Sequence, residues 1–324
     1  MSKGGSSQAG DRAVRVSGWG SAAFGLIVVV VLLALVLTSA QLRALLVEAI
    51  AQVTWLSVLA TIPGQAAAML LCAGALWALR PGVGYVACLG SRALRDASGN
   101  LPVSVPGFSA AVGARALVLA GGETRAAISA SALDKLAETV AQFPFIALAG
   151  WVLWRHWPLA LAFPPSAGWI VLAVVAALVI AGLLWQRFGA GSRLADRLLA
   201  ECRALLAAAR RQHGGMPAAL ALHCVAWLAG GLQLWMAGVA LGYPLSLFEA
   251  IAVESAAYAG RAMFFFVPAG LVSQEAGLVA AGLLFGLTAP QALALGLVLR
   301  LRDALMALGL LCWPLVEWRR RRLA

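Results

Sequence analysis

Charged side chains are scarce in this sequence, and acidic ones are the scarcest. Of 324 residues only 11% are charged, with 13 acidic against 24 basic residues and a formal net charge of +11. Soluble domains carry about 25% charged residues, so this composition excludes an ordinary water-soluble core. The cations, nearly all arginine, gather between apolar runs. That distribution indicates the orientation of a membrane protein rather than nucleic-acid binding.

Motifs for nucleotide, metal or hydrolytic chemistry are also missing. The sequence has no GxxxxGKS/T phosphate loop, no GxSxG elbow and no HExxH pair. Its three histidines, His156, His213 and His223, have no metal-ligand spacing and are expected in loops or in helix packing. The five cysteines are expected to be reduced and structural. We therefore expect no enzymatic activity, no catalytic residues, no cofactor and no metal.

Apolar sequence is what this chain has in abundance. It is 62% hydrophobic, with a mean hydropathy of +0.90. Runs of 18 or more apolar residues predict membrane-spanning helices, whereas barrel strands alternate apolar and polar residues. We therefore predict an all-α polytopic membrane protein with about eight transmembrane helices plus broken or re-entrant segments. The predicted spans are 19–37, 53–79, 133–154, 168–185, 216–241, 247–267 and 289–313.

Two details qualify these spans. The first apolar run follows Lys3 and Arg12 but is longer than the core of a secretory signal, so we favour an uncleaved helix over a signal peptide. The second contains Pro63-Gly64, which predicts a kink.

Two apolar segments, 101–120 and 268–288, are short and interrupted by proline and glycine. Such segments are typical of re-entrant helices, which are tolerated where they line protein or a polar cavity. For 101–120 the alternative is a helix on the membrane surface. The segments open similarly, with Asn100–Ser109 in the first half and Phe266–Ser273 in the second. This echo predicts a two-half internal repeat with a binding site between the halves, unless the match arose by chance.

The arginines indicate how the chain is oriented. If the N-terminus is inside and the spans alternate, the loops 80–95 and 187–211 and the tail 319–322 all lie inside, as positive residues do. The loops that hold Arg43 and Arg155 then lie outside. We therefore expect both termini to be cytoplasmic, in the inner membrane of a bacterium. The chain, 1–324, is predicted to be one membrane domain, with a first half at 18–186, a basic cytoplasmic linker at 187–213 and a second half at 214–324.

Ionisable residues inside the predicted spans need a reason, because each costs roughly 2.5–3.5 kcal/mol on insertion scales. Asp134 and Glu138 share one helix face at a spacing of four residues. They either serve a function or lie at the headgroup end of a helix. Glu254 and Arg261 also share a face, as a functional pair or as an internal ion pair that holds helices together.

The densest group of polar residues is near the C-terminus. Gln274 and Glu275 follow the Pro268 break, and the last span contains Arg300, Arg302 and Asp303. The two arginines and the aspartate lie too far into that span to reach either surface easily. A planar guanidinium suits a phosphate or carboxylate on a lipid headgroup. The alternative is an internal salt-bridge network.

Several of these segments resemble one known family. The run Phe266–Leu278, FVPAGLVSQEAGL, with Leu284–Leu287 and Leu299–Asp303, resembles the flippase-like family that includes the transmembrane region of lysylphosphatidylglycerol synthase. The Gln-Glu-Ala-Gly and Arg-x-Arg-Asp spellings are closest to the branch associated with hopanoid biosynthesis. Asn100–Val103 and Ala132–Phe143 resemble that branch too. Relatives carry a Gly-Glu and a nearby arginine where this chain has Pro-Gly-Phe-Ser at 106–109.

The resemblance implies a helical membrane domain with re-entrant segments around a lipid-accessible cavity, and a role in lipid translocation. Aminoacylating members carry a further soluble catalytic domain. This chain has no room for one after its last predicted span, so we do not expect an aminoacyltransferase.

Together these observations predict a flippase- or scramblase-type protein that handles a membrane lipid, a hopanoid or a related amphiphile. Without a nucleotide motif it would scramble lipids, use an ion gradient or depend on a partner. One alternative is a non-transporting scaffold that docks lipid-biosynthesis enzymes through 187–211. Another is an intramembrane lipid-modifying enzyme using Asp134 and Glu138 as acid and base. The residues predicted to bind lipid or its headgroup are Gln274, Glu275, Arg300, Arg302, Asp303, Asp134, Glu138, Glu254 and Arg261.

Overall fold

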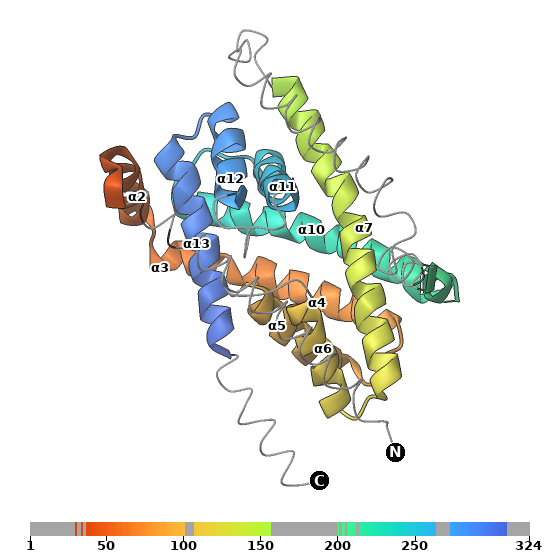
Figure 1. Cartoon of the computed structure of the whole chain (residues 1–324). Coiled ribbons are helices and arrows are strands. Elements are labelled where there is room, and N and C mark those ends of the chain that lie inside the picture. The colour runs from red at the N-terminus through yellow and green to blue at the C-terminus, as the bar shows by residue number, and fades with distance from the viewer. Residues whose placement is uncertain are drawn as a thin grey trace, which may run out of the picture.

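The computed structural model describes residues 37–100, 107–156, 214–263 and 273–309, with isolated positions at 30, 34, 200 and between 203 and 211. Every regular element within these residues is a helix, and ten helices are defined (Figure 1). The predicted all-α class is therefore confirmed for the described part of the chain.

Within the described residues, two stretches of helix are long and apolar enough to cross a membrane. One is Trp55–Ala78, made of α3 (Trp55–Ala60) and α4 (Ile62–Ala78), and the other is α10 (Gly215–Ala240). They match the predicted spans 53–79 and 216–241. The predicted kink lies at Thr61, between α3 and α4, because Pro63 occupies the first turn of α4. The predicted spans 19–37 and 168–185 lie outside the described residues.

Two helices replace predicted loops. α2 (Ala40–Gln52) begins after Ser39, whose hydroxyl caps it by accepting from the Leu42 amide at 3.2 Å. α5 (Tyr85–Gly99) occupies most of the predicted arginine-rich loop 80–95. The prediction of a loop there was wrong because the polar residues of α5 lie on one helical face and are buried, which hydropathy alone does not reveal.

Eight of the helices form two sets built to the same plan. In both sets, six residues join the first helix to the second (79–84 and 241–246), and four join the third to the fourth (120–123 and 285–288). The third helix has 12 residues in each set. The first set is α4, α5, α6 (Phe108–Leu119) and α7 (Thr124–His156); the second set is α10, α11 (Leu247–Met263), α12 (Ser273–Leu284) and α13 (Ala289–Ala307).

The matching turns also share their backbone hydrogen bonds. Gly122 donates its amide to the Leu117 carbonyl, and Leu287 donates to the Gly282 carbonyl, both at 3.0 Å. The residue before each donor is a glycine in the left-handed region, with φ of 99° at 121 and 79° at 286. This is the usual way for a helix to end at a left-handed residue. The likeness between the sets therefore extends from the lengths of two connections and of the third helix to individual turns.

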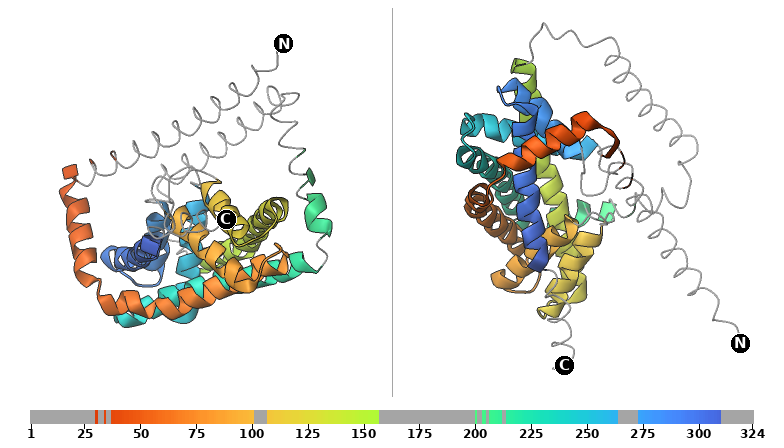
Figure 2. Two further views of the ribbon diagram at one scale, coloured as in Figure 1. Left: turned by 90° about the horizontal axis from the view of Figure 1, so that it is seen from below. Right: turned by 90° about the vertical axis from the view of Figure 1, so that its left-hand side faces the viewer.

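The two sets run in opposite directions. α4 and α10 lie side by side and antiparallel, and α7 and α13 also point in opposite senses (Figures 1 and 2). The pair α5 and α6 lies at one end of this arrangement and the pair α11 and α12 at the other (Figure 1). Each set has its own apolar core, represented by Leu79 and Leu117 in the first and by Leu234 and Leu295 in the second.

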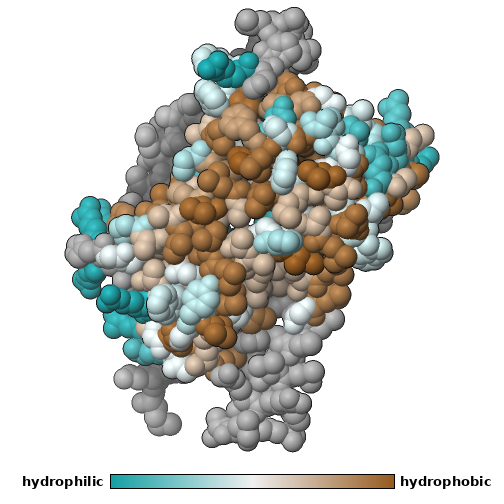
Figure 3. Space-filling view, turned by 180° about the vertical axis from the view of Figure 1, so that it is seen from behind, coloured by the Kyte–Doolittle hydropathy of each residue, from teal (hydrophilic) through white to brown (hydrophobic). Residues whose placement is uncertain are grey.

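The outside of the described part carries many large apolar side chains. Trp55, Leu59, Trp77, Leu228 and Val239, all on the two membrane-length stretches, are among the exposed ones. The space-filling view shows hydrophobic residues spread over a broad face (Figure 3). Soluble monomers rarely expose apolar patches beyond a few hundred Å², so this surface is suited to an apolar surrounding.

Candidate functional site

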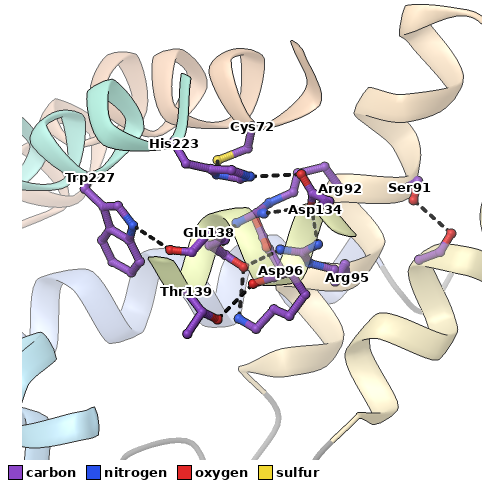
Figure 4. Close-up of polar contacts among 12 residues, drawn as sticks. Cys72, Ser91, Arg92, Arg95, Asp96, Asp134, Glu138, Thr139, His223 and Trp227 are labelled. Atoms are coloured by element: carbon purple, nitrogen blue, oxygen red, sulfur yellow. Dashed lines mark hydrogen bonds and ion pairs between the residues drawn. The ribbon is translucent and has the colours of Figure 1, made fainter. Parts of the chain in front are cut away.

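Asp134 and Glu138 both face α5, where two arginines meet them (Figure 4). Arg95 donates from one nitrogen to Asp134 Oδ2 and from the other to Glu138 Oε2. Arg92 donates to Glu138 Oε1 at 2.8 Å and to Asp96 Oδ2 at 2.9 Å. Lys135 adds a contact to Glu138 Oε2 at 2.9 Å. The structure thus joins residues 39 to 46 positions apart in the sequence.

α10 completes this group from the second set. His223 Nε2 lies 2.9 Å from Asp134 Oδ1, and the other ring nitrogen lies 3.6 Å from the Cys72 sulfur. Trp227 donates its indole N–H to the Glu138 backbone carbonyl at 3.2 Å (Figure 4). His223 was expected only to pack or to lie in a loop, but it is buried and contacts a carboxylate. We call this group the first-half cluster: Arg92, Arg95, Asp96, Asp134, Lys135, Glu138 and His223.

The carboxylates of Asp134 and Glu138 are fully partnered. Each of their four oxygens contacts Arg92, Arg95 or His223. The one buried atom here without a hydrogen bond is a donor, Arg92 Nη1, which lies 3.8 Å from Asp134 Oδ2. Asp134 is 0% exposed. In this structure these oxygens neutralise the arginines of α5.

The predicted C-terminal group is also drawn together by ion pairs. Glu275 on α12 accepts from Arg300 on α13 at 2.8 Å. Arg302 donates twice to its neighbour Asp303, at 2.7 and 3.1 Å, and once to the side-chain oxygen of Gln233 on α10. Gln233 was not predicted, because a single amide inside an apolar run gives no periodic signal.

Glu254 lies on α11 with Arg261 and is 4% exposed. α11 packs against α12, which carries Gln274 and Glu275, and against α10, which carries Gln233. Gly230 on α10 leaves room beside Glu254, since a Cβ there would lie 3.7 Å from Glu254 Oε1. We call this group the second-half cluster: Gln233, Glu254, Arg261, Gln274, Glu275, Arg300, Arg302 and Asp303.

Three acceptor atoms in the second-half cluster are buried without a hydrogen-bond partner. They are Glu254 Oε2, Gln274 Oε1 and Glu275 Oε2. Gln274 is 7% exposed, so bulk solvent has little access to it. Leaving a buried acceptor unsatisfied costs about 1–3 kcal/mol, and more when the acceptor is charged. Together with Arg92 Nη1, these are all the buried side-chain nitrogen and oxygen atoms of the described residues that lack a partner.

The described residues offer no cluster of metal-binding side chains, but they line an open cavity. No group of three or more His, Cys, Asp or Glu side chains there is placed to hold a metal ion. An open cavity of about 700 Å³ is lined by residues at the turn between α4 and α5 and at the start of α10, including Trp77, Arg80 and Gly215. None of its lining residues belongs to either cluster.

Comparison with protein-family models, curated proteins and solved structures found no match.

Proposed function

We propose that this protein is a polytopic membrane protein of the lipid translocase type, with the second-half cluster as its polar site. The observation that supports this proposal is that charged side chains are buried while large apolar side chains are exposed, the opposite of the usual arrangement in a soluble protein. Glu254 and Asp134 are buried between helices while Trp55 and Leu228 face outward. Charged residues are almost never fully buried in soluble proteins unless paired. In membranes they face the bundle interior and mark substrate pathways.

The lengths of α6 and α12 support the proposal that these helices belong to re-entrant segments. At 1.5 Å per residue, the 12 residues of α6 and of α12 rise about 18 Å, less than the roughly 30 Å hydrocarbon core. In this proposal 85–119 and 247–284 are re-entrant hairpins, and the full crossings are 19–37, 53–79, 133–154, 168–185, 216–241 and 289–313. Six crossings and two hairpins keep both termini on the cytoplasmic side, as the arginines predict. The segment 247–267 then belongs to a hairpin rather than to a crossing.

The antiparallel sets support a transporter-type repeat. In inverted repeats of this kind, substrate sites lie near the middle of the membrane at the interface between repeats, beside interrupted helices. The second-half cluster fits that place because Gln233 lies on α10, which packs along α4, and Gln274 and Glu275 lie in the first turn of α12. A hopanoid or related amphiphile remains the expected cargo, on the resemblance alone.

The experiment is a leaflet-exchange assay in reconstituted vesicles. Fluorescent lipids should move between leaflets faster with the wild-type protein than in empty vesicles. Arg300→Gln, which removes the partner of Glu275, should slow that movement. Glu123→Gln is the matched control, because Glu123 is an exposed residue outside both clusters. Movement no faster than in empty vesicles would contradict a translocase and favour the scaffold reading.

A further inference from the structure

The charged residues on the second and fourth helices of the two clusters occupy the same places in their sets. Arg92 is the eighth residue of α5, and Glu254 is the eighth residue of α11. The twelfth residues of α7 and α13 are both cations, Lys135 and Arg300. The fifteenth residues of the same helices are both acids, Glu138 and Asp303. The second helix thus carries opposite charges in the two sets, while the fourth keeps the same pattern.

One difference between the sets leaves the second-half cluster without a hydrogen-bond donor that the first-half cluster has. In the first set, Arg95, the eleventh residue of α5, donates to Asp134 and to Glu138. The eleventh residue of α11 is Ala257, which is buried and has no polar side chain. The donor that closes the first-half cluster therefore has no counterpart beside Glu254.

The unsatisfied acceptors lie on two helices held in direct contact. A Cβ on Gly260 of α11 would lie 2.4 Å from the Ser273 carbonyl oxygen, and one on Gly277 of α12 would lie 2.5 Å from the Ala256 carbonyl oxygen. The backbones of α11 and α12 therefore touch without intervening side chains. This contact holds the two backbones that carry Glu254, Gln274 and Glu275 in a fixed relation to one another.

Two of the three arginines of the cluster are already paired. Arg300 bonds to Glu275, and Arg302 bonds to Asp303 and to Gln233. Three guanidinium groups and three carboxylates give the cluster no net formal charge. A phosphate brings only further acceptors, which would leave Glu254 Oε2, Gln274 Oε1 and Glu275 Oε2 without donors.

We infer that the second-half cluster binds the hydrogen-bond-donating part of a lipid headgroup, an ammonium or a set of hydroxyls, through Glu254, Gln274 and Glu275. This inference rests on the proposed function, in that the ligand is a membrane lipid. It replaces the expectation that the arginines would bind a phosphate. A trimethylammonium headgroup has no N–H and would not satisfy these atoms.

The test is native mass spectrometry of the full chain after exchange into mixed vesicles. These contain equal amounts of phosphatidylethanolamine, phosphatidylglycerol and phosphatidylcholine with identical acyl chains. The donor-bearing lipids should be retained about tenfold or more over phosphatidylcholine, the change expected for one hydrogen bond to a charged group. Preference for phosphatidylethanolamine identifies an ammonium, and preference for phosphatidylglycerol identifies hydroxyls.

Two variants connect the preference to the cluster. Gln274→Met removes one acceptor without changing charge, and Glu254→Gln replaces a carboxylate with an amide of the same shape. Both should reduce the donor preference at least severalfold, whereas Glu123→Gln should keep it. Equal retention of the three lipids, or a preference unchanged in both variants, overturns the inference and leaves lipid handling standing. Retention of no lipid overturns the proposed function, and the inference with it.

Discussion

The first-half and second-half clusters stand at equivalent places in two similar sets of helices, but they differ in how fully their polar atoms are bonded. In the first-half cluster, Arg95 donates to the carboxylates of both Asp134 and Glu138. His223, on α10, contacts the other oxygen of Asp134. In the second, the side chains of Glu254 and Gln274 keep buried oxygens without donors. In one copy of the repeated arrangement every carboxylate oxygen of Asp134 and Glu138 is bonded, whereas the other keeps three buried acceptors without donors, and the proposed ligand binding rests on this difference.

The largest expected effect is on the stability of the first-half cluster. Arg95→Met should destabilise the protein by about 3–5 kcal/mol, because it leaves Asp134 and Glu138 as buried charges without their shared partner. Lys135→Met is the control, since the Lys135 side chain is 58% exposed and its ion pair should contribute less than about 1 kcal/mol. Thermal unfolding in detergent measures both. Equal shifts would contradict the distinction between them.

The same change made in both clusters sharpens the comparison. Glu138→Gln should destabilise the protein by about 2 kcal/mol, because it weakens charged hydrogen bonds to Arg92 and Arg95. Glu254→Gln should alter stability by less than about 1 kcal/mol, because Glu254 Oε2 has no partner to lose. Thermal unfolding of the two variants side by side decides the point. A larger loss at Glu254 would show that its carboxylate is bonded.

The contact between α11 and α12 gives the next effect. Gly260→Ala should destabilise the protein by about 1–3 kcal/mol, because the new methyl group would overlap the Ser273 carbonyl and push the helices apart. Gly90→Ala, on α5, has open space around it and should be neutral or slightly stabilising. The Gly260 variant should also lose donor-lipid retention in the mass-spectrometric assay. A Gly260→Ala protein with wild-type unfolding temperature would show that the helices do not touch.

The smallest effect concerns the first turn of each set. Arg80 and Gly242 are each the second residue after their helix, with φ of 52° and 75°. Arg80→Gly should stabilise by up to about 1 kcal/mol, because glycine adopts this backbone region without steric cost. Gly242→Ala should destabilise by a similar amount, and melting curves measure both. Shifts of the same sign would show that the two turns are not equivalent.

The positions of several helices could be predicted from the sequence, but the ion-pair partners of Asp134 and Glu138 could not. Long apolar runs predicted the helices at 55–78 and 215–240, and Pro63 predicted the interruption before α4. The spacing of Asp134 and Glu138 predicted a shared face. Their partners Arg92 and Arg95 were assigned to a surface loop, because arginine in a short polar stretch is usually at the surface and only tertiary contacts reveal a buried one.

Two features of the second-half cluster could not be predicted from the sequence: the part played by Gln233 and the lack of a donor beside Glu254. Gln274, Glu275, Arg300, Arg302 and Asp303 were grouped by position in the sequence, and the structure does bring Glu275 to Arg300. Gln233 was missed because it lies about 70 residues from Arg302. The lack of a donor beside Glu254 is a property of the assembled helices, so no local pattern could indicate it.

The contact between α4 and α10 connects the second-half cluster to the first set of helices. Gly64 on α4 lies against Gln233, and a Cβ there would come within 2.6 Å of the Gln233 side chain. Gln233 in turn accepts from Arg302. Gly64 therefore acts as a spacer that sets how far α10 stands from α4, and hence where the partner of Arg302 is held. Sliding of α4 along α10 would therefore displace Gln233 and, with it, the acceptor that Arg302 bonds to.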